Sequence, residues 1–154
     1  MARAQALQQG AGNLHDVDFL AWTERQAEAL RARQIAALDW HHLLEEIEDM
    51  GASQRRELKS RLRVLLMHLI KWKWQAEKRS PSWMATLVEQ RYALEDLLEV
   101  SPGLRGTPLD EAFADAWPKA VNPASLESAL PLSTFPQHCP WTREDVLSPD
   151  WMPE

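Results

Sequence analysis

The fold of this chain is decided by residues 58–72, which read LKSRLRVLLMHLIKW. Leucines recur in this stretch at alternating spacings of four and three residues, at Leu58, Leu62, Leu65 and Leu69. That spacing is typical of a helix whose apolar seam packs against other helices. From Val64 to Trp72 the stretch is apolar almost all round, so we expect a central helix that contacts more than one neighbour.

Helix signals on both sides of this stretch indicate an all-α fold. Ser80-Pro81 and Thr107-Pro108 each place a hydroxyl side chain before a proline, which is typical of a helix start. Gly51 is expected to end one helix. Pro118 is expected to end or kink another, because an interior proline removes a backbone hydrogen bond. The predicted helices cover about residues 16–33, 39–50, 53–78, 81–100 and 108–121, with a further break at Pro123 and a short turn over residues 142–146.

These segments predict a four- to five-helix bundle with an irregular, proline- and tryptophan-rich C-terminal tail. Residues 1–15 are mostly small and polar and are interpreted as a flexible leader, so residues 16–154 form a single predicted domain that Asp16 opens as a helix cap. In the tail, Trp141 and Trp151 are expected to dock onto the bundle. In the segment 39–50, the large apolar residues lie on one arc: Trp40, Leu43, Leu44, Ile47 and Met50.

The composition excludes several classes of protein. The single cysteine, Cys139, excludes an internal disulfide framework and a thiolate zinc site. No apolar run approaches the roughly 20 residues of a membrane span, and no apolar leader segment follows the N-terminus. Phosphate-binding loops, dinucleotide fingerprints and Gly-x-Ser-x-Gly motifs are absent. We therefore expect a cytoplasmic protein with no cofactor and no membrane partner.

Charge is segregated along the chain. Residues 1–54 carry a net charge of −5, residues 55–79 carry +7 and residues 80–154 carry −8, which gives −6 overall. A net acidic chain is a poor default binder of nucleic acid, because phosphate contacts need a basic footprint. Segregated charge instead suits a complementary protein partner.

Four blocks of the sequence resemble one bacterial family. They read DFLAWTERQAEALR, LDWHHLLEEIEDMG, RRELKSRLRVLLMHLIKWKWQAEKRSPSWMATLVEQR and TFPQHCPWTREDVLSPDWMPE. In order and spacing, residues 17–154 resemble domain of unknown function number 29. The resemblance implies a small, intracellular, all-helical protein, and it supplies no activity. The family pattern is similar to this chain at Glu45, Glu46, Glu48, His68, Lys71, Trp72, Arg79, Ser80 and Trp83. The chain departs from it near Pro118 and Pro123, where relatives read as continuous helix.

The acidic segment 41–49 is the first candidate site. Helical geometry sorts its polar residues into two neighbouring rows, His41, Glu45 and Glu48 in one and His42, Glu46 and Asp49 in the other. Imidazole and carboxylate groups one turn apart can share a metal ion, and His68 on a facing helix could add a ligand. A metal-dependent enzyme is therefore one alternative, with Glu46, Glu48 and His68 as candidate catalytic groups and His41, His42, Glu45 and Asp49 as candidate ligands. Because the chain contains no Glu-x-x-His pair, a solvated acidic face is favoured.

His68 itself lies in the apolar run VLLMHLIKW. A buried histidine more often forms a hydrogen bond with a backbone carbonyl than acts as a general base, since a base needs a cleft and a second functional group. We therefore expect a structural polar residue at this position.

The basic segment 55–79 is the second candidate site. Arg55, Lys59 and Arg63 form one row, and Lys71, Lys73, Trp74 and Arg79 lie toward its far end. Cations interleaved with aromatics can hold single-stranded nucleic acid, which is a further alternative. Against it, an acidic helix over 39–50, antiparallel to this one, would neutralise the basic charge. The favoured function is a non-catalytic module that contacts another protein, or itself, through these seven residues.

Overall fold

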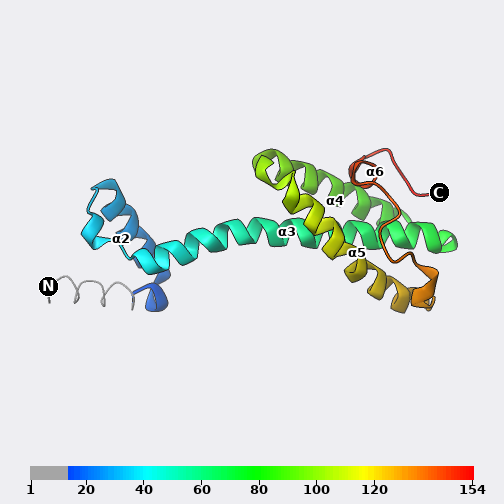
Figure 1. Cartoon of the computed structure of the whole chain (residues 1–154), viewed down its shortest axis with the longest axis horizontal. Coiled ribbons are helices and arrows are strands. Elements are labelled where there is room, and N and C mark those ends of the chain that lie inside the picture. Colours follow the sequence, from blue (N-terminus) through cyan, green and yellow to red (C-terminus); the bar gives the residue numbers. More distant parts are fainter. Residues whose placement is uncertain (1–13) are drawn as a thin grey trace. The chain divides into compact units, whose positions relative to one another are not determined.

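The computed structural model describes residues 14–154 of the chain (Figure 1). These residues contain helices and no β-strand, so the prediction of an all-α fold is confirmed. Where the sequence predicted one domain, the chain divides into two compact units, residues 1–52 and residues 53–154. The predicted flexible leader, residues 1–15, falls almost wholly outside the described residues, and residues 14–17 are helical.

The first unit contains α2 (Phe19–Arg31), the 3-10 turn η1 (Ile35–Ala37) and the start of α3 (Trp40–Trp74). Asp18 caps α2, because its carboxylate accepts a 3.0 Å hydrogen bond from the backbone N–H of Ala21. The predicted cap at Asp16 was therefore wrong, since Asp16 lies in the helical turn that precedes Asp18. Among the described residues of this unit, the buried ones are Trp22, Gln26, Ala29, Leu38 and Asp39.

α3 is a single helix of 35 residues. The predicted break at Gly51 between helices over 39–50 and 53–78 was wrong. Glycine in a helix interior costs about 1 kcal/mol relative to alanine, which good helix formers on both sides outweigh. No glycine of the described range has the positive φ typical of a helix stop. The predicted turn is thus absent, and the antiparallel pairing of residues 39–50 with residues 53–78 has no basis.

The second unit packs the remainder of α3 with α4 (Pro81–Val100) and α5 (Thr107–Ser128) around one core (Figure 1). The 3-10 turns η2 (Ala76–Lys78) and η3 (Pro102–Leu104) connect these helices. All four seam leucines of residues 58–72 are buried, as predicted. α4 begins after Ser80, whose hydroxyl accepts a 3.2 Å hydrogen bond from the N–H of Trp83, also as predicted.

α5 continues through Pro118 and Pro123, so the predicted end near residue 121 was wrong. One side of α5 presents alanines at every fourth position, which are buried: Ala112, Ala116, Ala120 and Ala124. Small side chains allow the helix to approach its neighbours closely. This packing outweighs the two backbone hydrogen bonds that the prolines cannot donate. The helix ends at Ala129, which has the left-handed φ of 58°.

The C-terminal segment contains the 3-10 turn η4 (Leu132–Thr134) and the short helix α6 (Arg143–Leu147). Trp141 and Trp151 pack against the core of the second unit, which confirms the predicted docking. Thr142 caps α6 by accepting a 3.1 Å hydrogen bond from the N–H of Asp145. Among the described residues, none of the helices has the length and apolar character needed to cross a bilayer.

Candidate functional site

Histidine and carboxylate side chains gather in the first unit. We call this group the histidine cluster; it consists of His15, Asp16, Asp39, His42 and Glu46. His15 Nε2 lies 2.7 Å from Glu46 Oε1, and His42 Nδ1 lies 2.7 Å from Asp39 Oδ2. The imidazole rings of His15 and His42 stack, with centroids 4.2 Å apart and planes inclined by 20°. Two imidazoles are thus in contact, each held by its own carboxylate.

Asp39 anchors the histidine cluster. Its carboxylate accepts a 3.1 Å hydrogen bond from the indole N–H of Trp22, and its backbone N–H donates at 2.8 Å to Gln26 Oε1. Burial opposes the charge on this carboxylate, but hydrogen bonds from His42 and Trp22 outweigh burial and hold the pKa of Asp39 below its ordinary value. The anchored carboxylate orients the His42 ring and leaves its Nε2 available.

His15 lies between two carboxylates. Hydrogen bonds to Glu46 and Asp16 raise the pKa of His15 above its ordinary value. Sequence reasoning missed this residue because it fell in the predicted leader. Asp39 entered the prediction only as the first residue of the helix expected over residues 39–50. The i, i+3 spacing of Asp39 and His42 at a helix start was the one signal that pointed to their contact.

The predicted acidic site is only partly assembled. His42 and Glu46 belong to the histidine cluster, and His41 forms an exposed pair with Glu45 at 3.4 Å. Glu48 and Asp49 are exposed and lie outside it. His68 lies in the second unit, and its combination with Glu46 or Glu48 depended on the missing turn at Gly51.

His68 forms the kind of contact expected of a structural residue. Its Nδ1 lies 2.9 Å from the main-chain oxygen of Val64. Burial lowers the pKa of His68 below its ordinary value, so the neutral ring is favoured. The thiol of Cys139 is also partly buried, and burial raises its pKa, which disfavours the reactive thiolate.

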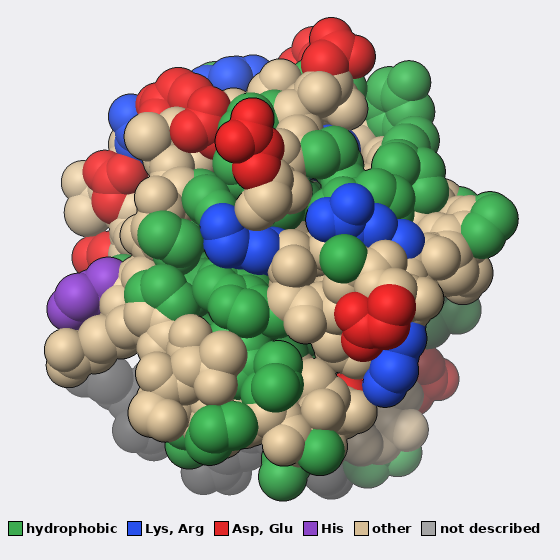
Figure 2. Space-filling view, turned by 90° about the vertical axis from the view of Figure 1, so that its right-hand side faces the viewer, with side chains coloured by type: hydrophobic (Ala, Val, Ile, Leu, Met, Phe, Trp, Pro, Cys, Tyr) green, Lys and Arg blue, Asp and Glu red, His purple; other side chains and the backbone are tan. Residues whose placement is uncertain are grey.

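The predicted interaction surface on the basic segment divides into two parts. Arg55, Lys59 and Arg63 are exposed and form no ion pair within residues 14–154. The far end is held by contacts within the second unit. Figure 2 shows one face of the molecule, on which Lys and Arg side chains lie beside hydrophobic ones. Lys71 pairs with Glu127 at 2.8 Å, and Lys73 donates to the main-chain oxygen of Glu154 at 3.0 Å.

The remaining two residues of that surface are also held by the fold. Arg79 stacks over Trp72 at 4.9 Å. Trp74 is partly buried and contacts Phe135 and Trp141, with ring centroids 5.3 and 6.0 Å away. Trp74 thus belongs to an aromatic cluster that packs against the C-terminal segment, and its role as a contact residue stays a prediction.

The first unit instead exposes its own apolar row. Trp40, Leu44 and Ile47 of α3 have 58%, 58% and 65% of their surface exposed. We call these three residues the apolar stripe. Met50, one turn further along, is 71% exposed. The arc expected from the sequence is therefore present, but it does not face a core.

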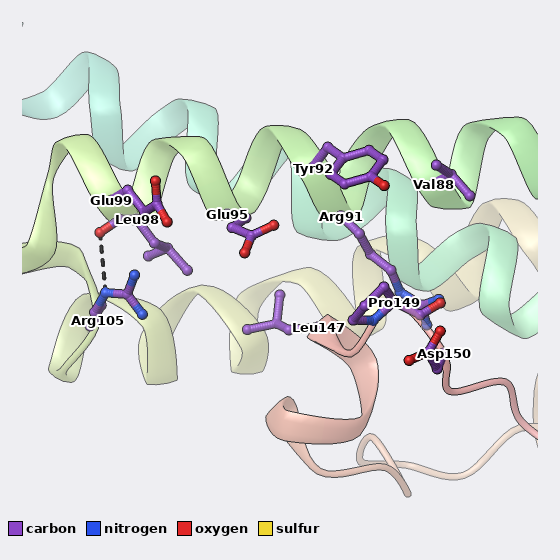
Figure 3. A pocket seen from close by; sticks show the side chains of 10 residues that line it. All are labelled: Val88, Arg91, Tyr92, Glu95, Leu98, Glu99, Arg105, Leu147, Pro149 and Asp150. Atoms are coloured by element: carbon purple, nitrogen blue, oxygen red, sulfur yellow. Dashed lines mark hydrogen bonds between the residues drawn. The ribbon is translucent and has the colours of Figure 1, made fainter.

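The second unit contains a cavity of about 400 Å³ between α4 and the C-terminal segment (Figure 3). Glu95, Glu99 and Asp150 line it with carboxylates. Its basic groups are occupied, since Arg91 holds main-chain oxygens of the C-terminal segment and Arg105 Nε donates to the main-chain oxygen of Leu98 at 3.1 Å. The cavity presents no pair of nucleophile and base to which a reaction could be assigned.

The fold defines the class: in the described residues this is an all-helical protein of two compact units. The family model described as "Domain of unknown function DUF29" matches residues 14–152. The chain therefore belongs to this family. The resemblance seen in the four sequence blocks is thereby confirmed. Neither curated proteins nor solved structures gave a match.

Proposed function

We propose that this protein is a non-catalytic helical module that binds another protein through the apolar stripe of its first unit. One observation carries the proposal: Trp40, Leu44 and Ile47 are each more than half exposed at spacings of four and three residues. Single exposed apolar residues are common on protein surfaces, whereas a contiguous row marks an interaction site. The i, i+4, i+7 spacing is that of a helix that inserts its apolar anchors into a groove.

The charge around the apolar stripe supports a particular kind of partner. Residues 39–49 carry a net charge of −5, and Glu45, Glu48 and Asp49 are exposed beside the stripe. A groove with an apolar floor and a basic rim would complement this face. Tryptophan is among the residues that contribute most to binding at such contacts, so Trp40 is the expected main anchor.

The proposal also includes a location for the protein. We propose that it acts in the cytoplasm of a bacterium. Single-stranded nucleic acid is a weaker candidate for the partner. The accessible basic row of Arg55, Lys59 and Arg63 would favour it, but the net charge of −6 opposes phosphate binding.

The test compares three forms of the full chain as bait for proteins of the source organism. The stripe variant carries Trp40→Ala, Leu44→Ala and Ile47→Ala, which keep helix propensity while removing the anchors. The matched control carries Val100→Ala and Leu126→Ala, which replace side chains that are 79% and 84% exposed in the second unit. We expect the wild type and the control to retain a protein that the stripe variant loses. Thermal unfolding should differ little among the three.

Sedimentation velocity of the same three proteins separates a foreign partner from self-association. A wild type that sediments as a dimer, together with a monomeric stripe variant, would identify a second copy as the occupant. If the stripe variant retains the same proteins as the wild type and sediments identically, the proposal is wrong.

A further inference from the structure

We infer that His15, Asp16 and His42 form a binding site for a divalent transition-metal ion of the zinc type, in which Glu46 and Asp39 orient the two imidazoles. One donor atom from each of the three residues lies within 4.8 Å of the other two. His15 Nδ1 and Asp16 Oδ1 are already 3.1 Å apart. Zinc binds nitrogen and oxygen at about 2.0–2.2 Å, so neighbouring donors around it lie roughly 3–3.5 Å apart. Rotation of the two imidazoles toward a common point would therefore close the site.

The orienting carboxylates distinguish this group from a chance contact of charged side chains. A metal-bound histidine characteristically has its second nitrogen held by a carboxylate or carbonyl. Glu46 contacts Nε2 of His15 at 2.7 Å, and Asp39 contacts Nδ1 of His42 at 2.7 Å. This leaves Nδ1 of His15, beside Asp16, and Nε2 of His42 for an ion. Trp22 in turn fixes Asp39, so the support extends into the core of the unit.

Burial at the site is uneven in a way that suits a metal. The side chains of His15 and His42 are 17% and 16% exposed, whereas that of Asp16 is 72% exposed. An ion could enter from the Asp16 side and meet two imidazoles that carboxylates already hold close together. Three protein ligands leave a fourth position for water or for a group of a bound partner.

The ligand set also selects the class of ion. Two imidazoles and one carboxylate suit zinc and its neighbours, whereas calcium and magnesium prefer sites made of oxygen alone. The stacked rings of His15 and His42 make a further consequence testable. An ion lies in the plane of each imidazole that binds it, so zinc should turn the two rings out of their parallel arrangement.

A competing set of ligands shares one residue with this site. His41, His42 and Glu45 also lie close enough to hold an ion. The side chains of His41 and Glu45 are 76% and 54% exposed, and no orienting carboxylate besides Glu45 itself contacts the His41 ring in the described part of the chain. Substitutions at Asp16 and at His41 therefore separate the two sets.

The experiment is isothermal titration of ZnCl₂ alone into the untagged, chelator-treated full chain. We expect about one zinc ion per chain for the wild type. Asp16→Asn should weaken binding at least tenfold and should not unfold the protein, because that side chain is exposed. Glu46→Gln should weaken it by about 10- to 100-fold, the range found for orienting partners. The matched control His41→Gln should bind like the wild type.

Nuclear magnetic resonance of the imidazole protons gives a second readout on the same samples. Zinc should shift the signals of His15 and His42 and leave those of His68 and His138 in place. Absence of saturable binding to the wild type would overturn the inference. So would a loss of binding in His41→Gln with full binding in Asp16→Asn. The stripe variant retains every residue of the site, so failure here leaves the proposed protein contact standing.

Discussion

Arg91 Nη2 donates a 2.7 Å hydrogen bond to the main-chain oxygen of Trp151, which lies 60 residues later in the chain. The same guanidinium donates from Nε to the oxygen of Val146 at 3.0 Å and from Nη1 to that of Pro149 at 3.2 Å. Arg91 is 5% exposed, and burial lowers its pKa below the ordinary value while the group stays charged. One side chain of α4 thus satisfies three carbonyls of the C-terminal segment.

Replacement of Arg91 by lysine should release this segment. A lysine ammonium cannot reproduce the planar fork of a guanidinium, so at least one buried carbonyl loses its donor. We expect Arg91→Lys to lower the free energy of unfolding by about 2–3 kcal/mol. Urea denaturation measures the loss, and limited proteolysis should show faster cleavage after residue 140. The control is Arg105→Lys, which alters an exposed arginine and should change stability by less than about 0.5 kcal/mol. Equal stability of the two variants would contradict the anchoring role.

Trp74 should behave as a core residue. It packs against Phe135 and Trp141, so Trp74→Ala should lower the free energy of unfolding by about 3 kcal/mol. Thermal unfolding of the full chain tests this, with Trp40→Ala as the matched control at a tryptophan that is 58% exposed. The control should shift stability by no more than about 0.5 kcal/mol. A Trp74→Ala protein as stable as the control would instead support the prediction of a surface contact residue.

Gly51 provides a direct test of the continuity of α3. A Cβ built at Gly51 meets no atom within 4 Å, and its φ is not positive. Gly51→Ala should therefore raise the free energy of unfolding by about 0.5–1 kcal/mol, because alanine loses less backbone entropy in a helix. Equilibrium denaturation in urea gives the value. A helix that stopped at Gly51 in the left-handed conformation would instead be destabilised by the added Cβ.

His68 should make stability depend on pH. In the folded chain, burial lowers the pKa of His68 below its ordinary value of 6.5. The unfolded chain therefore binds the proton more readily. The contribution of the neutral ring is therefore complete above about pH 6.5 and is lost as the pH falls toward the folded-state pKa. His68→Gln keeps a donor for the oxygen of Val64 but cannot titrate. The stability of the wild type relative to this variant should decrease between pH 7.5 and pH 5 in urea denaturation. A constant difference would show that His68 titrates alike in both states.

Local patterns in the sequence determined much of the second unit. The four-and-three spacing of its leucines identified the buried seam of α3. Ser80-Pro81 gave the start of α4, and Thr142 gave the start of α6. These features depend on residues within one or two helical turns of each other. They can therefore be predicted from the sequence without knowledge of the tertiary structure.

Tertiary structure decided the features that local patterns left open. Gly51 and the prolines of α5 carry weak or unfavourable helix propensity, and only the helix on either side and the packing of its buried face determine whether the helix continues. Whether a tryptophan anchors the core, as Trp74 does, or stays exposed, as Trp40 does, depends on what covers it. The sequence pattern had placed Trp40 on the apolar arc of its helix and Trp74 on the basic interaction surface.

The histidine cluster shows the same limit at the level of a site. From their spacing along a helix, the sequence identified His42 as a candidate ligand and Glu46 as a candidate catalytic group. It did not bring in His15, which is 31 residues from Glu46 and meets it only because the helical turn before α2 folds back against α3 within the first unit. The sequence by itself determined the leucine seam of α3 and the caps at Ser80 and Thr142, because these follow from periodicity and short-range hydrogen bonds. Only the tertiary structure decided which helices continue, which aromatic side chains are buried and which charged groups meet, because these depend on contacts between residues far apart in the chain.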